Sequence, residues 1–198
     1  MLSLCKPHPS TVRSFLETQE TLRFAYDGVG STSSPGLPSG YVVDRTRVLV
    51  GEGESAFRAA RTALECWEHF RLGWLQVCSP PKRLAPGAVV AVIARASGIW
   101  WLNACRIVYV ADDDGPSRRF GFAYGTLPGH AESGEERFLI EWDRSSDRVT
   151  YDILAFSRPN HFMVWIGYPL ARRLQRRFAR DSGAALVRAV RQRLDGCR

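Results

Sequence analysis

The sequence has no uncharged apolar run of the roughly 20 residues that a membrane-spanning helix requires. Its opening stretch, MLSLCKPHPSTVRSF, also lacks an apolar block long enough for a secretory signal peptide. These two absences predict a cytoplasmic protein. Apolar residues are nevertheless plentiful, at 45% of the chain with 11% aromatic, so the composition excludes intrinsic disorder and indicates a globular fold.

Lysine is almost absent, since only Lys6 and Lys82 occur and arginine supplies the rest of the 27 basic residues. Nine arginines and two acidic residues lie between position 168 and the C-terminus, so this segment carries a net charge of +7, equal to that of the whole chain. We interpret it as a solvated helix face. An anionic membrane surface or an acidic protein is the alternative partner for it, and nucleic acid is the least favoured one.

Paired cysteines and metal-ligand spacings are missing as well. The five cysteines are odd in number and include no C-x-x-C pair, which indicates neither a disulfide framework nor a zinc site. The four histidines, at positions 8, 69, 130 and 161, stand far apart. The phosphate-binding, dinucleotide-binding and common hydrolase motifs do not occur either. The sequence therefore predicts no metal and no cofactor.

Hydrophobic periodicity predicts the order of the elements. Residues 41–50 alternate as a strand does, and residues 55–72 show the three- and four-residue apolar spacing of an amphipathic helix. From residue 88 to 157 further strands follow one another across short turns, which is typical of an antiparallel meander. After Pro169 a long helix runs to the region of the C-terminus.

We therefore predict an α+β fold in which a curved antiparallel sheet of about six to seven strands wraps around the long C-terminal helix, a helix-grip-like arrangement. Residues 41–198 are expected to form this single domain, and residues 1–40 an N-terminal extension and loop with a short helix over 11–24. The C-terminal helix has positions expected to be buried (Leu170, Leu174, Phe178, Leu186 and Val190) and positions expected to be exposed (Arg173, Arg176, Arg177 and Arg180).

Three stretches resemble a known family. They are GEGESAFRAARTALECWEHFRLGW (51–74), FGFAYGTLPGHAESGEERFLIEW (120–142) and ILAFSRPNHFMVWIGYPLARRLQRRFARDS (153–182). Together they resemble the bacterial and plant proteins catalogued as domain of unknown function 1990, over about residues 24–192. The resemblance implies a helix-grip-like fold, as in START and birch-pollen-allergen-like proteins, and no particular reaction.

One polar segment is YGTLPGHAESGEERF (124–138), in which we expect an eleven-residue excursion between two strands. It places His130 near Glu135 and Glu136, and a histidine beside a carboxylate can transfer protons near neutral pH. These three residues are therefore the catalytic candidates. The alternative is structural: the two carboxylates cap backbone amides or pair with arginine, and His130 maintains the shape of the loop.

A second polar segment, FSRPNHF (156–162), follows the last strand. If the last two strands pair around a turn at 145–146, Glu135 lies opposite about residue 156, and Glu135 and Glu136 then lie near Ser157 and Arg158. We expect a carboxylate–guanidinium pair there, in a polar mouth on an apolar cavity. The alternative is again a structural salt bridge. The ligand-binding candidates are Tyr124, Thr126, His130, Glu136, Ser157, Arg158 and His161.

Three functions follow from this reading. The first is a binding protein for a small apolar or amphipathic ligand held between the sheet and the C-terminal helix. The second is an enzyme that acts on such a molecule through the His/Glu/Arg mouth, and the third is a peripheral adaptor that uses the basic helix. The numerous aromatic residues either line a cavity or fill the core, and a filled core would favour the adaptor.

Overall fold

The computed structural model describes residues 1–160 and 168–196 of the chain. Its strands are β1 (Leu2–Ser3), β2 (Val42–Glu52), β3 (Leu75–Cys78), β4 (Val89–Ala96), β5 (Ile99–Asp114), β6 (Ser117–Thr126), β7 (Glu132–Asp143) and β8 (Arg148–Pro159). Its helices are α1 (Pro9–Gln19), α2 (Gly53–Glu65) and α4 (Tyr168–Asp195), with single 3₁₀ turns η1 (Ser31–Ser33) and η2 (Glu68–Phe70).

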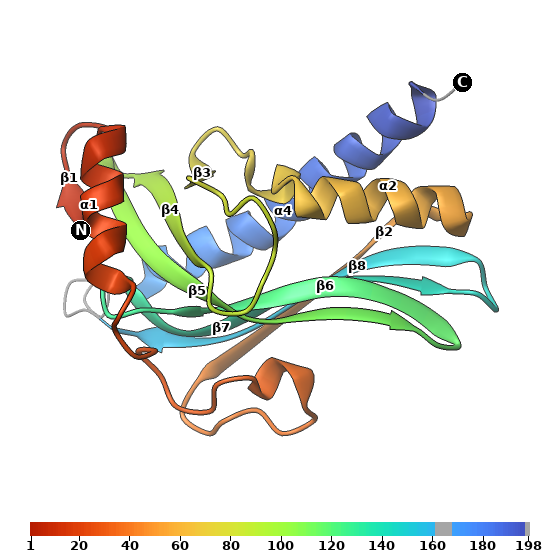
Figure 1. Ribbon diagram of the computed structural model, residues 1–198, viewed down its shortest axis with the longest axis horizontal. Helices are drawn as coiled ribbons and strands as arrows, with labels where there is room; N and C mark the ends of the chain where they lie inside the picture. The colour runs from red at the N-terminus through yellow and green to blue at the C-terminus, as the bar shows by residue number, and fades with distance from the viewer. Residues whose placement is uncertain (161–167, 197–198) are drawn as a thin grey trace.

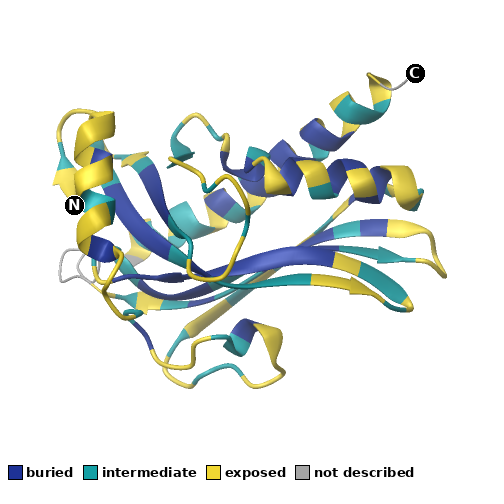
Figure 2. Ribbon diagram, viewed as in Figure 1, coloured by how far each residue is buried: buried dark blue, intermediate teal, exposed yellow. Residues whose placement is uncertain are grey.

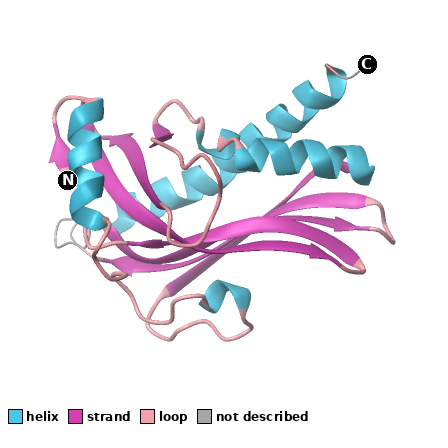
Figure 3. Cartoon of the chain, in the orientation of Figure 1, coloured by secondary structure: helices cyan, strands magenta, loops and turns pink. Residues whose placement is uncertain are grey.

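One antiparallel sheet organises the molecule. Its strands lie in the order β2-β8-β7-β6-β5-β4-β3, and the short β1 pairs with β5. The sheet is strongly curved, and α2 and α4 lie against its concave face (Figures 1 and 3). The sequence-based prediction of an α+β fold, with a curved antiparallel sheet around a long C-terminal helix, is confirmed.

Short turns explain why successive strands pair with each other. Ser97 and Gly98 both have positive φ angles, of 50° and 78°, which suits the two-residue turn between β4 and β5. Asp143 closes the turn between β7 and β8. Its carboxylate accepts hydrogen bonds from the backbone N–H of Ser145 and from the hydroxyl groups of Ser145 and Ser146. These local signals determine the meander before any long-range contact forms.

Helix α2 contributes the predicted apolar stripe to the core but ends earlier than expected. Its buried side chains are Ala56, Phe57, Ala59, Ala60, Ala63 and Leu64. The predicted helix over 55–72 stops at Glu65 because Trp67 adopts a left-handed conformation (φ 56°) that leads into η2. Trp67 and Phe70 then pack with Phe122 and Phe138 of the sheet, so the break in the helix directs aromatic rings into the core.

Helix α4 is more deeply buried in its C-terminal half than in its first turns (Figure 2). Phe178, Leu186 and Val190 are buried as expected, and the expected exposed arginines are exposed. Leu170 was expected to be buried, but 45% of its surface is exposed. The reason is that the first turns of α4 cover a cavity rather than a filled core, and Leu174 is only half-buried for the same reason.

The N-terminal segment packs on the convex face of the sheet. Helix α1 begins after His8, two residues earlier than predicted, and places Val12 against Ala91, Ile93 and Leu102. Residues 24–40 then run along the convex side, opposite the two long helices (Figure 1).

Candidate functional site

A cavity of about 390 Å³ lies between the concave face of the sheet and the first turns of α4. Its apolar wall comes from β3, β4 and β5 together with aromatic and aliphatic side chains around them, among which are Phe70, Trp74, Trp101, Leu174 and Phe178. Its polar wall comes from β2, β7 and β8 and from α4. The cavity therefore has one apolar side and one polar side.

Five of the residues proposed from the sequence as ligand-binding line this cavity. They are Tyr124, Thr126, His130, Glu136 and Ser157. Arg158 is not among the described lining residues, and His161 lies outside the described residues. The two polar segments do meet, because the backbone N–H of Asn160 donates to the carbonyl oxygen of Ala131 at 3.1 Å.

Glu136 and Tyr124 form the polar pair at the centre of the sheet. The two residues are direct partners in the β6–β7 register, and the Tyr124 hydroxyl donates to Glu136 Oε2 at 2.8 Å. Burial raises the pKa of Glu136 to about 8, and it also raises the pKa of Tyr124 well above its usual value. Glu136 is therefore largely protonated at neutral pH and can donate as well as accept a hydrogen bond.

Gln175 on α4 connects the helix to the polar wall. Its side-chain amide donates to Glu132 Oε1 at 2.7 Å and to Ser157 Oγ at 2.9 Å. Its amide oxygen accepts from Arg172, which also binds Asp44 with two hydrogen bonds of 2.5 and 2.6 Å. Burial raises the pKa of Glu132. The start of α4 is thus tied to β2, β7 and β8 through polar contacts at the cavity.

The sequence-based reading did not identify Asp44, Arg172 or Gln175 as part of the site. One signal was present: Asp44 stands at an alternate position of its strand together with Thr46, which also lines the cavity. An acidic residue on the inward-facing side of a strand is uncommon in a core and points to a polar partner there. No such signal marks Gln175, which lies in an arginine-rich stretch of the helix.

The assignment of Glu135 as a catalytic candidate is not supported, because its carboxylate is directed to the convex face. It accepts from the Tyr26 hydroxyl at 2.7 Å, from the backbone N–H groups of Gly30 at 2.7 Å and Thr32 at 3.0 Å, and from the Thr32 hydroxyl. Only 2% of the residue is exposed. Glu135 therefore anchors the N-terminal segment, which agrees with the structural alternative of backbone capping.

The expected ion pair between Arg158 and Glu135 or Glu136 does not form. The predicted register is correct, since Glu135 pairs with Phe156, but Arg158 pairs with Ser133 two residues further on. Successive residues of a strand point to opposite faces, so the two glutamates cannot both face one arginine. The Arg158 guanidinium lies 4.6 Å from the centre of the Tyr41 ring instead.

His130 is not poised to titrate near neutral pH as the sequence suggested. Burial lowers its pKa to about 4, and its Nδ1 atom accepts a hydrogen bond from the backbone N–H of Glu132 at 2.9 Å. The expected eleven-residue excursion is also wrong, because β6 extends to Thr126 and β7 begins at Glu132. A connection of five residues remains, and His130 stabilises it.

Within residues 1–160 and 168–196, no group of three or more His, Cys, Asp or Glu side chains is arranged to hold a metal ion. None of the helices in this part of the chain combines the length and the apolar character needed to cross a membrane. The chemistry that the cavity offers therefore rests on its carboxyl, hydroxyl, amide and aromatic groups.

Known proteins resemble this chain in sequence and in fold. A UPF0548 protein of Dictyostelium discoideum is 33% identical over 207 residues, which cover 96% of both chains. A UPF0548 protein of Arabidopsis thaliana is 33% identical and covers 96% of this chain and 98% of its own. The crystal structure of Ara h 8.0201 aligns with 77% of this chain and 99% of its own at 10% identity, with a TM-score of 0.48. The family model described as a domain of unknown function, DUF1990, matches residues 25–185, and the chain belongs to this family.

Proposed function

We propose that this protein binds a small apolar or amphipathic molecule in the cavity between the sheet and α4. The observation that carries the proposal is the cavity itself, whose volume of about 390 Å³ is in the range of small-molecule sites. Protein interiors are otherwise close-packed, so an opening of this size beneath a tethered helix is not ordinary packing. A filled core would have favoured the adaptor, and the cavity favours a ligand.

The division of the cavity wall supports an amphipathic ligand. Trp74, Trp101 and Phe178 offer flat apolar surface, whereas Glu136, Ser157 and Gln175 offer hydrogen-bonding groups on the other side. A few polar groups in an otherwise apolar pocket orient a ligand while its apolar body supplies most of the binding free energy.

The test is a binding titration with the neutral apolar fluorophore N-phenyl-1-naphthylamine, followed by native mass spectrometry of the purified protein for a co-purified molecule. Ala155 lines the cavity between Asp44 and Glu136 in the strand register, so Ala155→Phe fills it. Ala184→Phe, on the exposed side of α4, is the matched control. We expect saturable fluorescence enhancement in the wild type and the control, and its loss in Ala155→Phe. Equal binding by Ala155→Phe would contradict the proposal.

The second candidate function is an enzyme that transfers protons inside the cavity. It is favoured by Glu136, whose pKa of about 8 keeps it exchangeable near neutral pH beside the Tyr124 hydroxyl. Of the His/Glu/Arg mouth expected from the sequence, Glu136 is the member that retains this role. If a molecule recovered by native mass spectrometry is converted by the wild type and not by Glu136→Gln, the enzyme is supported. Recovery of the molecule unchanged supports the binding protein.

A further inference from the structure

We propose that the molecule bound in this cavity is a cationic amphiphile, with an ammonium group at the polar wall and an apolar body against the aromatic wall. This inference rests on the proposed function, and it specifies the chemical class of the ligand. It follows from the charges that line the cavity, from their partners and from the walls around them.

The charge of the cavity is opposite to the charge of the protein. The chain as a whole carries a formal net charge of +7. In the part of the chain that the structure describes, however, the cavity lining includes Asp44, Glu132, Glu135 and Glu136 and not a single lysine or arginine. The carboxylate of Glu135 is bonded on the convex face, so the other three carboxyl groups are the ones at the cavity. The exposed arginines of α4 are not among its lining residues. A binding site for an anionic ligand in so arginine-rich a protein would be expected to use arginine.

The carboxyl groups at the cavity differ in the groups that compensate their negative charge. Asp44 is neutralised by the two hydrogen bonds from Arg172. Glu132 receives a hydrogen bond from the amide of Gln175 and Glu136 one from the hydroxyl of Tyr124, and neither forms an ion pair with a residue in 1–160 or 168–196. An ionised carboxylate in an apolar site requires a positive partner or a proton.

The cavity meets this requirement with a proton, as the raised pKa values of Glu132 and Glu136 indicate. An ammonium group of a ligand can replace that proton, because it supplies both the positive charge and N–H donors for the unused carboxylate lone pairs. Binding then transfers the proton from Glu136 to the buffer. The titratable groups around Glu136 are Asp44 on β2, Cys105 on β5, Tyr124 on β6, Glu132 on β7 and Tyr151 on β8. His130 lines the same cavity, and Arg172 on α4 binds Asp44.

The remaining walls suit the rest of such a ligand. Trp74, Trp101 and Tyr124 line the same cavity, and a cation near the face of an aromatic ring is attracted by the ring electrons. The half-exposed Leu170 and Leu174 provide an apolar margin beneath α4. A primary amine on a chain of about ten carbons therefore finds complementary groups along its whole length.

The experiment compares three probes that each contain ten carbons and differ in head group: decylammonium, decanol and decanoate. Each displaces N-phenyl-1-naphthylamine at pH 7. We expect decylammonium to bind about tenfold more tightly than decanol, which corresponds to about 1.4 kcal/mol, since charge-assisted hydrogen bonds are about twice as strong as neutral ones. Decanoate should bind most weakly. Calorimetry in buffers of different ionisation enthalpy should show that about one proton is released with decylammonium.

Variants separate the charge from the shape of the site. Glu136→Gln retains an acceptor for the Tyr124 hydroxyl. Decylammonium should lose much more affinity than decanol in this variant, so most of the tenfold preference and the proton release should disappear. The matched control is Glu141→Gln on the same strand, whose carboxylate pairs with Arg119 on the convex face. It should leave all three affinities unchanged.

The outcomes distinguish this inference from the proposed function. If decanol binds and decylammonium has no advantage, or if decanoate binds best, the cationic ligand is wrong and the binding protein stands. If N-phenyl-1-naphthylamine binds but none of the three probes displaces it, the cationic ligand is wrong and the binding protein stands. If N-phenyl-1-naphthylamine itself does not bind, both are wrong. If Glu136→Gln weakens all three probes equally, the residue shapes the cavity, and the assignment of the charge preference to its carboxylate is refuted.

Discussion

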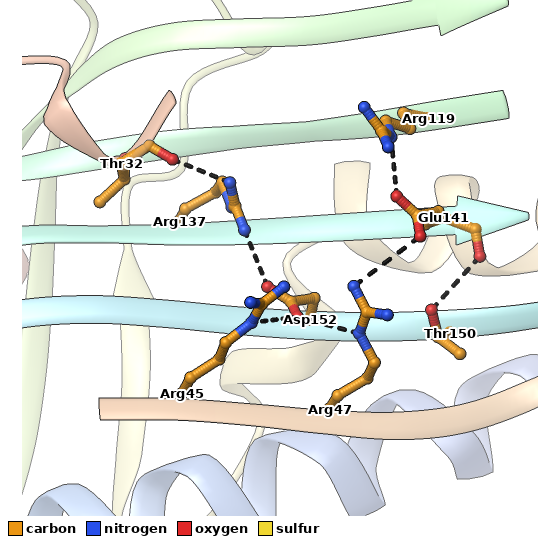
Figure 4. Close-up of polar contacts among 8 residues, drawn as sticks. All are labelled: Thr32, Arg45, Arg47, Arg119, Arg137, Glu141, Thr150 and Asp152. Carbon is orange, nitrogen blue, oxygen red and sulfur yellow. Dashed lines mark hydrogen bonds and ion pairs between the residues drawn. The ribbon is translucent and has the colours of Figure 1, made fainter. Parts of the chain in front are cut away.

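Two carboxyl groups on opposite faces of the sheet, Asp152 and Glu136, have very different partners. On the convex face Asp152 is completely buried and receives hydrogen bonds from Arg45, Arg47 and Arg137 at 2.9 to 3.1 Å (Figure 4). On the concave face Glu136 has a tyrosine hydroxyl as its partner. The same strands thus carry a completed ionic network on one side and an uncompensated acid on the other. A structural role accounts for the convex face, and the concave face is where we propose that a ligand binds.

The pKa values follow the same division. Burial alone would raise the pKa of Asp152, but the hydrogen bonds from the three arginines outweigh it and the pKa is lowered. For Glu136 the effect of burial prevails, because the hydrogen bond from Tyr124 is the one contact within the described residues that lowers its pKa. The pKa of Glu136 therefore rises to about 8. Nearby Glu132 and Asp44 raise it further. The charge of each of these two carboxyl groups is therefore decided by its partners, which are three arginines for Asp152 and a tyrosine hydroxyl for Glu136.

The largest expected effect comes from Asp152→Asn. Arg137, whose side chain is only 17% exposed, would lose its neutralising carboxylate. We expect the free energy of unfolding to fall by about 3 kcal/mol, as for other broken buried pairs. Urea denaturation at pH 7 measures it. Asp114→Asn, which breaks the exposed contact with Arg144, is the control and should cost less than about 1 kcal/mol. A loss this small for Asp152→Asn would mean that the convex network is not structural.

The next largest effect is expected from Glu135→Gln, compared with the same substitution at the neighbouring Glu136. Glu135→Gln removes the charge that holds four donors of the N-terminal segment, and we expect a loss of about 2 kcal/mol in the free energy of unfolding. Limited proteolysis should then cut within residues 24–40 first, because these residues depend on that anchor. Glu136→Gln should leave this segment protected. If both variants expose it equally, the division between the two faces does not hold at these positions.

The sequence carried enough information for the fold, because turn chemistry and strand alternation are local. It is less informative for the connection after β6, because the glycines there predict a loop where the strands continue. Gly125 and Gly134 lie inside strands, and each is a glycine because another group comes too close for a side chain. A Cβ atom on Gly125 would lie 2.1 Å from the Tyr26 hydroxyl oxygen, and one on Gly134 would lie 1.9 Å from the Phe156 carbonyl oxygen. Such contacts cannot be seen in a local window.

The site was predictable to a similar degree. Tyr124, Glu136 and Ser157 could be found because they lie near two polar segments that the strand register brings together. The partner of Glu135 could not be found, because its donors come from a segment about a hundred residues earlier in the chain. Gln175 was missed for the same reason, as its role depends on how α4 docks on the sheet.

The smallest expected effect is on the pH dependence of stability. The pKa of Glu136 is about 8 in the folded state against an ordinary value of 4.5, so between these values the folded protein holds a proton that the unfolded chain has released. Stability is therefore lost as the pH rises, until Glu136 ionises in both states above about pH 8. Asp152 acts in the opposite sense, because its lowered pKa costs stability only as the pH falls below its ordinary value of 3.8.

The pH dependence due to Glu136 is best measured above pH 6.5, the ordinary pKa of histidine. Below that pH the buried His69 and His130, whose pKa values are lowered to about 3 and about 4, also reduce the free energy of unfolding. From pH 6.5 to 8.5 we expect the wild type to lose about 1–2 kcal/mol of unfolding free energy, given at most about 1.4 kcal/mol for each pH unit. Glu136→Gln cannot ionise and should remove most of this slope, whereas Glu141→Gln on the convex face should retain it. Guanidinium chloride denaturation at the two pH values measures each slope. If Glu136→Gln keeps the wild-type slope, Glu136 is ionised in the folded protein. The cavity then holds no proton on Glu136 that an ammonium group of a ligand could replace.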